Sequence, residues 1–294
     1  MENRRRKTYN CLCRPMALQT RQDLINLRYM ALSVLVAGLA ASTSQARTVC
    51  TAIADAETGR IVEQQGECSE RVTPASTFKI AISLMGFDAQ FLKDEHFPAL
   101  SFHEGYADWM PAWRQTTDPS NWIKYSVVWF SQQVTQFLGE DRFQKYIRDF
   151  SYGNEDISGN PGKHDGLTRA WLSSSLKISP LEQLVFLEKV VNRRLPVTSH
   201  AFDMTSRITQ ITMLPNGWDI HGKTGTGSPV APDGLRDQAH TYGWFVGWAT
   251  KGSQTVVFAR LIQDEKEETD PAGLRARSTF LNELPAILDS LTER

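Results

Sequence analysis

Residues 74–85 read Pro74-Ala75-Ser76-Thr77-Phe78-Lys79-Ile80-Ala81-Ile82-Ser83-Leu84-Met85, an apolar stretch that contains one lysine. After Pro74 the apolar residues cover nearly every face of a helix, which predicts a buried helix. An unpaired ammonium is costly to bury, so Lys79 needs a partner or a function. Ser76 lies three residues earlier, and this spacing places both side chains on one face.

Burial lowers the pKa of a lysine, so a neutral amine at Lys79 becomes accessible near pH 7. That amine can act as a base for the Ser76 hydroxyl, or CO2 can carboxylate it to a carbamate that acts as one. The alternative interpretation is a surface lysine that follows a helix-capping serine. Taken alone, the Ser-x-x-Lys pattern does not decide between them, because it recurs by chance in many helices.

A second polar segment, Lys223-Thr224-Gly225-Thr226-Gly227, follows a short strand-like run at 218–221. Gly225 and Gly227 remove side chains where a ligand could lie along a strand edge. Lys223, Thr224 and Thr226 offer a cation and hydroxyls to an anionic substrate. The alternative is an ordinary glycine-rich turn.

Two shorter patterns lie between these segments. Tyr125-Ser126-Val127-Val128 opens a helical pattern, where a serine is commonly only a cap. Tyr152-Gly153-Asn154 follows soon after Phe150. No pattern is specific alone, so the interpretation depends on their order and spacing along the chain.

The remaining patterns predict strands at both ends of the chain body and helices between them. Strand-like runs occupy 49–56, 59–65, 242–250 and 255–262, and helical patterns occupy 125–138, 141–150, 180–193, 201–213 and 274–291. Turn residues at 57–59 and 252–253 predict two hairpins. The order predicts an α+β fold in which N- and C-terminal strands share one antiparallel sheet, flanked by helices, with a helical region inserted between them.

The composition excludes several classes of protein. The chain has 294 residues, of which 41% are hydrophobic and 22% charged, as in ordinary globular proteins. Residues 1–46 hold seven basic and two acidic side chains, which leaves 25 basic and 31 acidic groups, a net charge of −6, in 47–294. Nucleic acids are not expected as partners, because phosphate binding requires a basic face.

The first 46 residues have the pattern of a secretory signal. An apolar run of 12 residues at 30–41 follows a basic segment, and Ser44 and Ala46 occupy the −3 and −1 positions of a plausible cleavage site. A membrane span needs about 20 apolar residues. We therefore expect cleavage after residue 46 and export of 47–294 to the periplasm, free of the membrane. An uncleaved anchor and translation from Met16 remain open.

Cysteine positions agree with export. Cys11 and Cys13 fall in the leader, whereas Cys50 and Cys68 flank the first predicted hairpin, which would bring them near disulfide distance. Two buried thiols are the alternative. Neither cysteine lies in a Cys-x-x-Cys pattern and the six histidines show no metal-ligand spacing, so no metal is expected.

Together, Ser76-x-x-Lys79, Ser126-x-Val128, Tyr152-Gly153-Asn154 and Lys223-Thr224-Gly225 resemble the class D serine β-lactamases, the oxacillinases, over about residues 48–294. The class A pattern fits less well, because it has Ser-Asp-Asn where this chain has Ser126-Val127-Val128. The Gly-x-Ser-x-Gly elbow of α/β-hydrolases is absent. The resemblance implies hydrolysis of β-lactam antibiotics, penicillins at least, and thereby resistance.

The resemblance also implies how the serine is activated. Ser76 would attack the lactam carbonyl, and Lys79, carboxylated by CO2 and needing no other cofactor, would act as the base in acylation and deacylation. Trp171 would donate a hydrogen bond to the carbamate, although a core aromatic is the alternative for this residue. Val128 and Leu172 would keep water out of that pocket.

On the substrate side, the resemblance implies that Ser126, helped by Lys223, relays a proton to the leaving nitrogen. The backbone N–H groups of Ser76 and Thr226 would form the oxyanion hole. The substrate would contact Thr224, Gly225 and Thr226, and its carboxylate would bind an arginine at the start of the last helix. Arg275 fits that position best, with Arg277 as the alternative.

Several questions stay open at this point. A β-lactam sensor domain or a penicillin-binding DD-peptidase would share the motifs but acylate without efficient turnover. Substrate range depends on loops around 99–120 and 228–240, where aromatic residues form either a site wall or core: Trp109, Met110, Trp113 and Trp122. The acidic stretch 264–270 is expected to be a solvated loop, with a cation site as the alternative. The protein could be a monomer or a homodimer.

Overall fold

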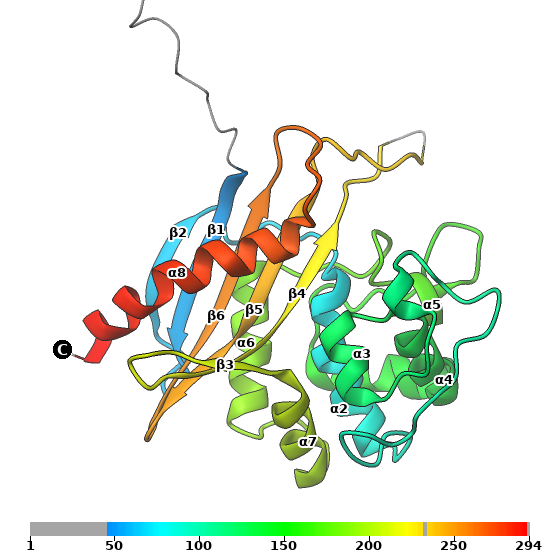
Figure 1. Ribbon diagram of the computed structural model, residues 1–294, viewed down its shortest axis with the longest axis horizontal. Helices are drawn as coiled ribbons and strands as arrows, with labels where there is room; N and C mark the ends of the chain where they lie inside the picture. The colour runs from blue at the N-terminus through cyan, green and yellow to red at the C-terminus, as the bar shows by residue number, and fades with distance from the viewer. Residues whose placement is uncertain (1–45, 232–233, 293–294) are drawn as a thin grey trace, which may run out of the picture. The chain divides into compact units, whose positions relative to one another are not determined.

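A six-stranded antiparallel sheet forms the centre of the computed structural model, which describes residues 46–231 and 234–292. The spatial order is β2-β1-β6-β5-β4-β3, so the N-terminal hairpin lies beside the C-terminal one, as predicted (Figure 1). The strands are β1 (Arg47–Asp55), β2 (Ile61–Gly66), β3 (Gln210–Met213), β4 (Asp219–Gly227), β5 (Tyr242–Lys251) and β6 (Gln254–Gln263).

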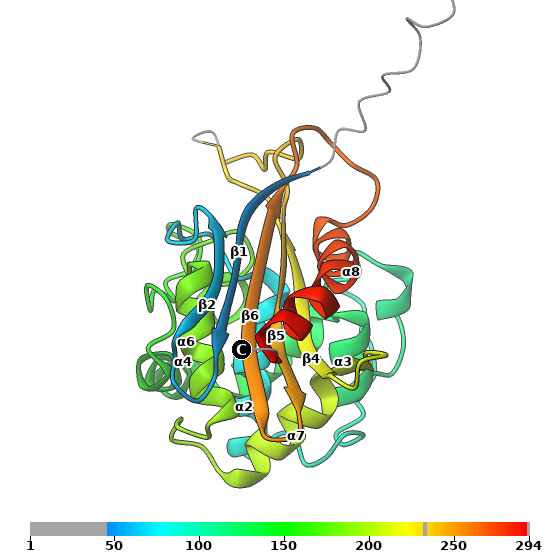
Figure 2. The ribbon, with the colours of Figure 1, turned by 90° about the vertical axis from the view of Figure 1, so that its left-hand side faces the viewer.

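Helices cover both faces of this sheet. The helical elements are η1 (Ala75–Phe78), α2 (Lys79–Asp88), η2 (Pro111–Trp113), α3 (Pro119–Tyr125), α4 (Val128–Phe150), α5 (Gly166–Arg169), α6 (Pro180–Val191), α7 (Ser199–Thr209) and α8 (Ala272–Thr292). Helix α8 lies on one face and α6 on the other (Figure 2). Helices α2 to α5 gather beside β4, which confirms the predicted helical insertion (Figure 1).

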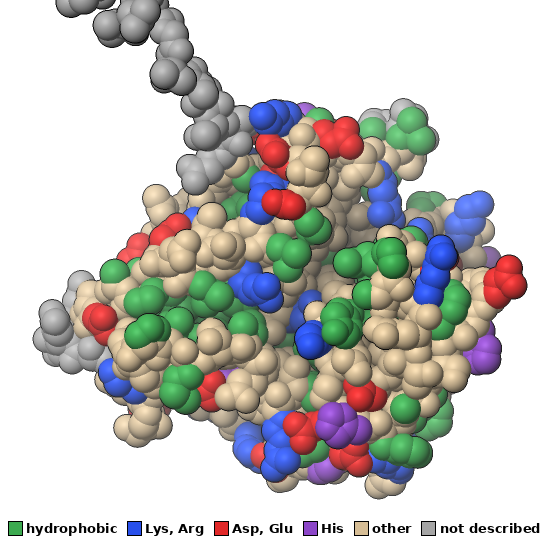
Figure 3. Space-filling view, in the orientation of Figure 1, with side chains coloured by type: hydrophobic (Ala, Val, Ile, Leu, Met, Phe, Trp, Pro, Cys, Tyr) green, Lys and Arg blue, Asp and Glu red, His purple; other side chains and the backbone are tan. Residues whose placement is uncertain are grey.

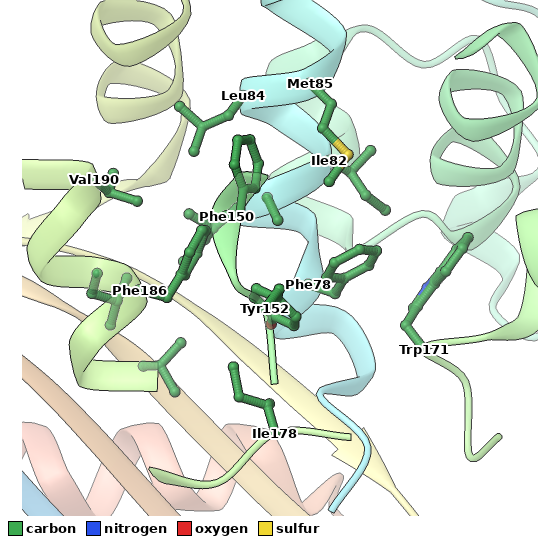
Figure 4. Close-up of a cluster of buried hydrophobic side chains, with 14 of the residues drawn as sticks. Phe78, Ile82, Leu84, Met85, Phe150, Tyr152, Trp171, Ile178, Phe186 and Val190 are labelled. Carbon is green, nitrogen blue, oxygen red and sulfur yellow. The ribbon is translucent and has the colours of Figure 1, made fainter. Parts of the chain in front are cut away.

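Each face of the sheet has its own apolar core. Under α8, the rings of Phe245, Phe258 and Phe280 pack together with centroid distances of 5.0–6.2 Å. The larger core joins the other face to the helical region, where Phe78 contacts Tyr152 and Trp171 (Figure 4). The start of α2 is thereby fixed between the sheet and the inserted helices.

Two predicted helices have different boundaries in the structure. The pattern over 201–213 ends as a helix at Thr209, and residues 210–213 form β3 on the edge of β4. β-Branched Ile211 and Thr212 suit a strand, although their spacing also fits a helix. The patterns over 125–138 and 141–150 form one element, α4, which begins at Val128 and is interrupted by the non-helical backbone of Gly139, whereas Tyr125 ends the separate helix α3.

The predicted hairpin brings Cys50 and Cys68 together. Their Cα atoms lie 5.1 Å apart and the two sulfurs are bonded, so the disulfide is confirmed. Within the ranges that the structure covers, no helix is long and apolar enough to cross a membrane. The leader predicted over 1–46 lies outside the described residues, apart from Ala46.

Candidate active site

Ser76 and Lys79 lie at the junction of η1 and α2. The Lys79 Nζ donates a hydrogen bond of 3.1 Å to the Ser76 Oγ, which is the contact that the three-residue spacing predicts. Lys79 is completely buried, whereas Ser76 is partly exposed. The preceding Ala75 has a φ of 49°, rare for a residue with a Cβ, and its N–H donates to the Trp171 carbonyl at 3.1 Å. The tertiary structure therefore holds this turn in place.

The electrostatic environment keeps Lys79 from behaving as an ordinary lysine. Burial lowers its pKa well below the usual range, and the positive charge of Lys223 lowers it further. Burial also lowers the pKa of Lys223 to about 7, with a contribution from the Arg277 guanidinium. No carboxylate in the described part of the chain forms an ion pair with any of these three side chains. The site can therefore attract an anion and accommodate a neutral amine.

Lys223 belongs to β4, whose free edge faces η1. Strand β3 pairs only with Asp219–His221 at the start of β4, which leaves 222–227 without a strand on that side. The Lys223 Nζ donates to the Thr224 carbonyl at 3.1 Å, and Thr226 is exposed. In the space-filling view, this face is hollowed between the sheet and the helical region, and Lys and Arg side chains lie in the hollow (Figure 3).

Gly225 and Gly227 of β4 make room for other parts of the protein, and not for a ligand as predicted. A Cβ on Gly225 would come within 2.8 Å of the Pro74 carbonyl oxygen and 3.1 Å of the Thr77 nitrogen. A Cβ on Gly227 would lie 2.5 Å from the Tyr242 hydroxyl. The space beside both glycines is therefore filled by protein and not left for a ligand. Gly225 allows η1, and with it Ser76, to approach the edge of β4.

Ser126 does not open a helix but lies between α3 and α4. Its backbone has φ 58° and ψ 37°, a left-handed conformation that is uncommon for serine. Its N–H donates to the Ile123 carbonyl at 3.3 Å, and the Val127 N–H donates to the Trp122 carbonyl at 3.1 Å. This turn exposes part of Ser126 and buries Val127 and Val128.

Trp171 contacts Ala75 and Phe78, the chain neighbours of Ser76 and Lys79. Its carbonyl accepts the Ala75 N–H, and its ring packs at 5.6 Å from the ring of Phe78. The indole N–H is buried and has no hydrogen-bond partner among the residues described. Leu172 and Val128 are buried as well. A buried unpaired donor is rare, so Trp171 is suited to a polar group that binds beside Lys79.

The Tyr152-Gly153-Asn154 motif packs against the core beneath the Ser76–Lys79 segment, through Phe78. Tyr152 is completely buried, packs at 5.0 Å against Phe78 and accepts a hydrogen bond of 3.4 Å from the Gln183 side chain (Figure 4). Gly153 has a φ of 58°, and a Cβ there would collide with the Lys177 carbonyl. The Asn154 side chain donates to the Ser175 carbonyl and accepts the N–H of Lys177. These contacts tie the 152–178 loop to the core.

The two candidate arginines of α8 have different surroundings. Arg275 forms an ion pair of 2.6 Å with Asp264 and donates to the Asp270 carbonyl at 3.0 Å. Arg277, also partly buried, lies close enough to Lys223 to lower the pKa of that lysine. Asp264 is thus buried and paired, not solvated, whereas 265–270 is exposed as expected. No cluster of acidic, histidine or cysteine side chains that could hold a metal ion occurs within 46–231 or 234–292.

Sequence reasoning left the tryptophans open and missed one polar residue. Trp113 and Trp122 are core residues, whereas Trp109 and Met110 are exposed. Gln183 is buried on α6 and donates to the hydroxyl of Thr77, the residue after Ser76, at 3.2 Å. A glutamine on the apolar face of the 180–193 pattern was the signal that could have identified it.

Comparison with known proteins agrees with this geometry. The family model described as "Penicillin binding protein transpeptidase domain" matches residues 49–286. β-Lactamase OXA-9 of Klebsiella pneumoniae is 44% identical over 81% of this chain and 88% of its own, and β-lactamase OXA-1 of Escherichia coli is 35% identical over 80% and 84%. The crystal structure of the OXA-427 class D β-lactamase is 50% identical, covers 82% of this chain and 99% of that chain, and superposes with a TM-score of 0.79. The chain therefore belongs to the class D serine β-lactamase family.

Proposed function

We propose that this β-lactamase hydrolyses penicillins through an acyl-enzyme on Ser76, with a carboxylated Lys79 as the base, and so confers resistance. The main support is the environment of Lys79: complete burial, a hydrogen bond to Ser76, a lowered pKa and no ion pair with any residue that the structure describes. A neutral amine reacts with CO2, whereas an ammonium does not. The same environment would otherwise make Lys79 only a destabilising residue.

The surroundings of Lys79 fit a carbamate. The unpaired indole N–H of Trp171 would donate to it, and Val128 and Leu172 would exclude water that promotes its loss. When carboxylated, Lys79 supplies an anionic oxygen base at a position where the described residues place no carboxylate. Ser76 loses its proton to that base, and the attacking water loses one in the second step.

Acylation forms the bond between the Ser76 Oγ and the lactam carbonyl carbon and breaks the lactam C–N bond. The backbone N–H groups of Ser76 and Thr226 would stabilise the oxyanion. The leaving nitrogen takes a proton from the Ser126 hydroxyl, and Ser126 takes back a proton from the Lys79 carbamate, which had received it from Ser76. The carbamate is thereby anionic again for the second step, and the positive charge of Lys223 assists the transfer. Water then hydrolyses the Ser76 ester and releases the opened product.

We assign the substrate carboxylate to Arg277 together with Thr224, in place of Arg275. Arg275 already neutralises the buried Asp264, whereas Arg277 has no carboxylate partner among the described residues and lies near Lys223. A guanidinium without a partner beside a buried cation favours binding of an anion.

We also propose that residues 47–294 act in the periplasm after removal of the leader, as a monomer or homodimer. The sequence of 30–46 and the Cys50–Cys68 disulfide support this location, because disulfides persist in oxidising compartments.

The carbamate is tested directly by 13C NMR with labelled bicarbonate. We expect one carbamate signal in the wild-type protein, no such signal in Lys79→Ala and a weaker signal in Trp171→Phe. Penicillin hydrolysis should rise with added bicarbonate and fall in acid. Hydrolysis that is indifferent to bicarbonate, together with full activity of Lys79→Ala, would contradict the proposed base.

A further inference from the structure

Trp113 contacts the backbone next to Ser126. It is the last residue of η2, 13 residues before Ser126 in the chain, and is almost completely buried. Its indole N–H donates to the Tyr125 carbonyl at 2.9 Å. That carbonyl belongs to the peptide group whose nitrogen is the amide of Ser126. The indole therefore fixes the plane of the peptide from which Ser126 extends.

Ser126 needs such support because little else determines its orientation. Its left-handed backbone is strained for a residue with a Cβ, and its N–H bond to Ile123 is long at 3.3 Å. Within the described chain, the Ser126 hydroxyl has no hydrogen bond that would orient it. A rotation of the Tyr125–Ser126 peptide would move the Cβ and hydroxyl of Ser126 together.

Trp113 is itself held by neighbouring residues. The Trp129 indole N–H donates to the Trp113 carbonyl at 3.0 Å, and the Trp113 N–H donates to the Met110 carbonyl at 2.9 Å. The Trp109 ring packs at 5.5 Å against the Trp113 ring. Trp129 lies in the first turn of α4, which begins at Val128, two residues after Ser126. A hydrogen bond from η2 therefore holds the backbone of the Ser126 turn, and a hydrogen bond from α4 holds η2.

We propose that Trp113 is a positioning residue for acylation: its indole N–H holds the Tyr125–Ser126 peptide so that the Ser126 hydroxyl faces the leaving nitrogen. This inference rests on the proposed proton relay through Ser126. Trp122 is not assigned this role, because its indole donates at 2.9 Å to the Ser131 hydroxyl within the core.

The test compares Trp113→Phe with the matched control Trp122→Phe, since each removes one buried indole donor. Rates of covalent penicillin addition to Ser76 are measured by mass spectrometry, and deacylation is followed separately. We expect Trp113→Phe to slow acylation about tenfold to a hundredfold with deacylation unchanged, because small displacements of a reacting group have effects of this size. Trp122→Phe should change acylation by less than about threefold, as expected for a residue outside the reacting geometry.

A double-mutant cycle separates positioning from general stability. In a Ser126→Ala background, Trp113→Phe should cause no further loss of acylation, because the group that it positions is gone. If Trp113→Phe does not fold, benzothienylalanine at 113, which replaces the indole N–H by sulfur, removes the donor and keeps the shape.

Each outcome bears on a different statement. A loss that multiplies in the Ser126→Ala background, or a Trp113→Phe variant that acylates at the wild-type rate, would overturn the positioning role alone. A wild-type protein that forms no adduct on Ser76 would overturn the proposed function, and the positioning role with it.

Discussion

At the scale of single residues, Lys79 carries the largest electrostatic cost of the site. Its ammonium is removed from water and faces the charge of Lys223, and among the described residues its hydrogen-bond partner is the Ser76 hydroxyl. The pKa of Lys79 is ordinarily 10.5 and lies well below that in the folded protein. The unfolded chain therefore binds more protons between these two pKa values, and the free energy of unfolding rises with pH through that window.

Replacement of this lysine should therefore stabilise the fold. We expect Lys79→Met to raise the free energy of unfolding by about 1–3 kcal/mol in bicarbonate-free buffer, because a buried charge is replaced by an apolar side chain of similar length. The gain should be largest in acid and should shrink as the pH approaches 10.5. Urea denaturation at several pH values measures it. A variant that is less stable than wild type at acidic pH would show that Lys79 is structural.

The two arginines of α8 should respond differently to truncation. We expect Arg277→Ala to raise the KM for penicillin about tenfold to a hundredfold with normal stability, because a charged hydrogen bond to the substrate is lost. Arg275→Ala should instead lower the free energy of unfolding by about 2–3 kcal/mol, because Asp264 is left buried and unpaired. Steady-state kinetics and urea denaturation distinguish the two roles. The reverse pattern would mean that Arg275, and not Arg277, binds the substrate carboxylate.

At the scale of elements, the strands and hairpins could be predicted from the sequence, whereas features that depend on tertiary contacts could not. Alternating apolar residues predicted β5 and β6, and the turn residues predicted both hairpins. The break at Ser126 could not be predicted, because no glycine or proline marks it and the spacing of the apolar residues after it fits a helix. Its left-handed backbone depends on tertiary contacts such as the indole of Trp113. The function of Gly225 was also hidden, because its neighbours Pro74 and Thr77 are distant in sequence.

The approach of η1 to β4 gives a prediction at this scale. Gly225→Ala should push η1 away from the strand, because the new Cβ meets backbone atoms of Pro74 and Thr77. We expect acylation of Ser76 to slow about a hundredfold, the typical effect of a small displacement of a reacting group. Mass spectrometry of the penicillin adduct gives the rate, and circular dichroism confirms folding. Acylation at the wild-type rate would mean that the close approach does not position Ser76.

At the scale of the whole molecule, the disulfide joins the N-terminal hairpin of the sheet across 18 residues. Closing a loop of that length restricts the unfolded chain and contributes about 3 kcal/mol. We therefore expect Cys50→Ser/Cys68→Ser to lose about this much unfolding free energy while its kcat stays near wild type, because the hairpin lies at the far edge of the sheet from β4. Urea denaturation of both proteins, with and without reductant, provides the measurement. Equal stability would show that the hairpin does not depend on the disulfide.

The measurement that decides the central claim is a time course of a chromogenic penicillin in large excess over residues 47–294, with bicarbonate present. We predict sustained hydrolysis over many equivalents of protein, because in the proposed mechanism Lys79 is the base for both formation and hydrolysis of the Ser76 ester. A single stoichiometric burst that stops would contradict this, and would mean that the protein acylates as a sensor domain or penicillin-binding peptidase does, with Lys79 active only in the first step.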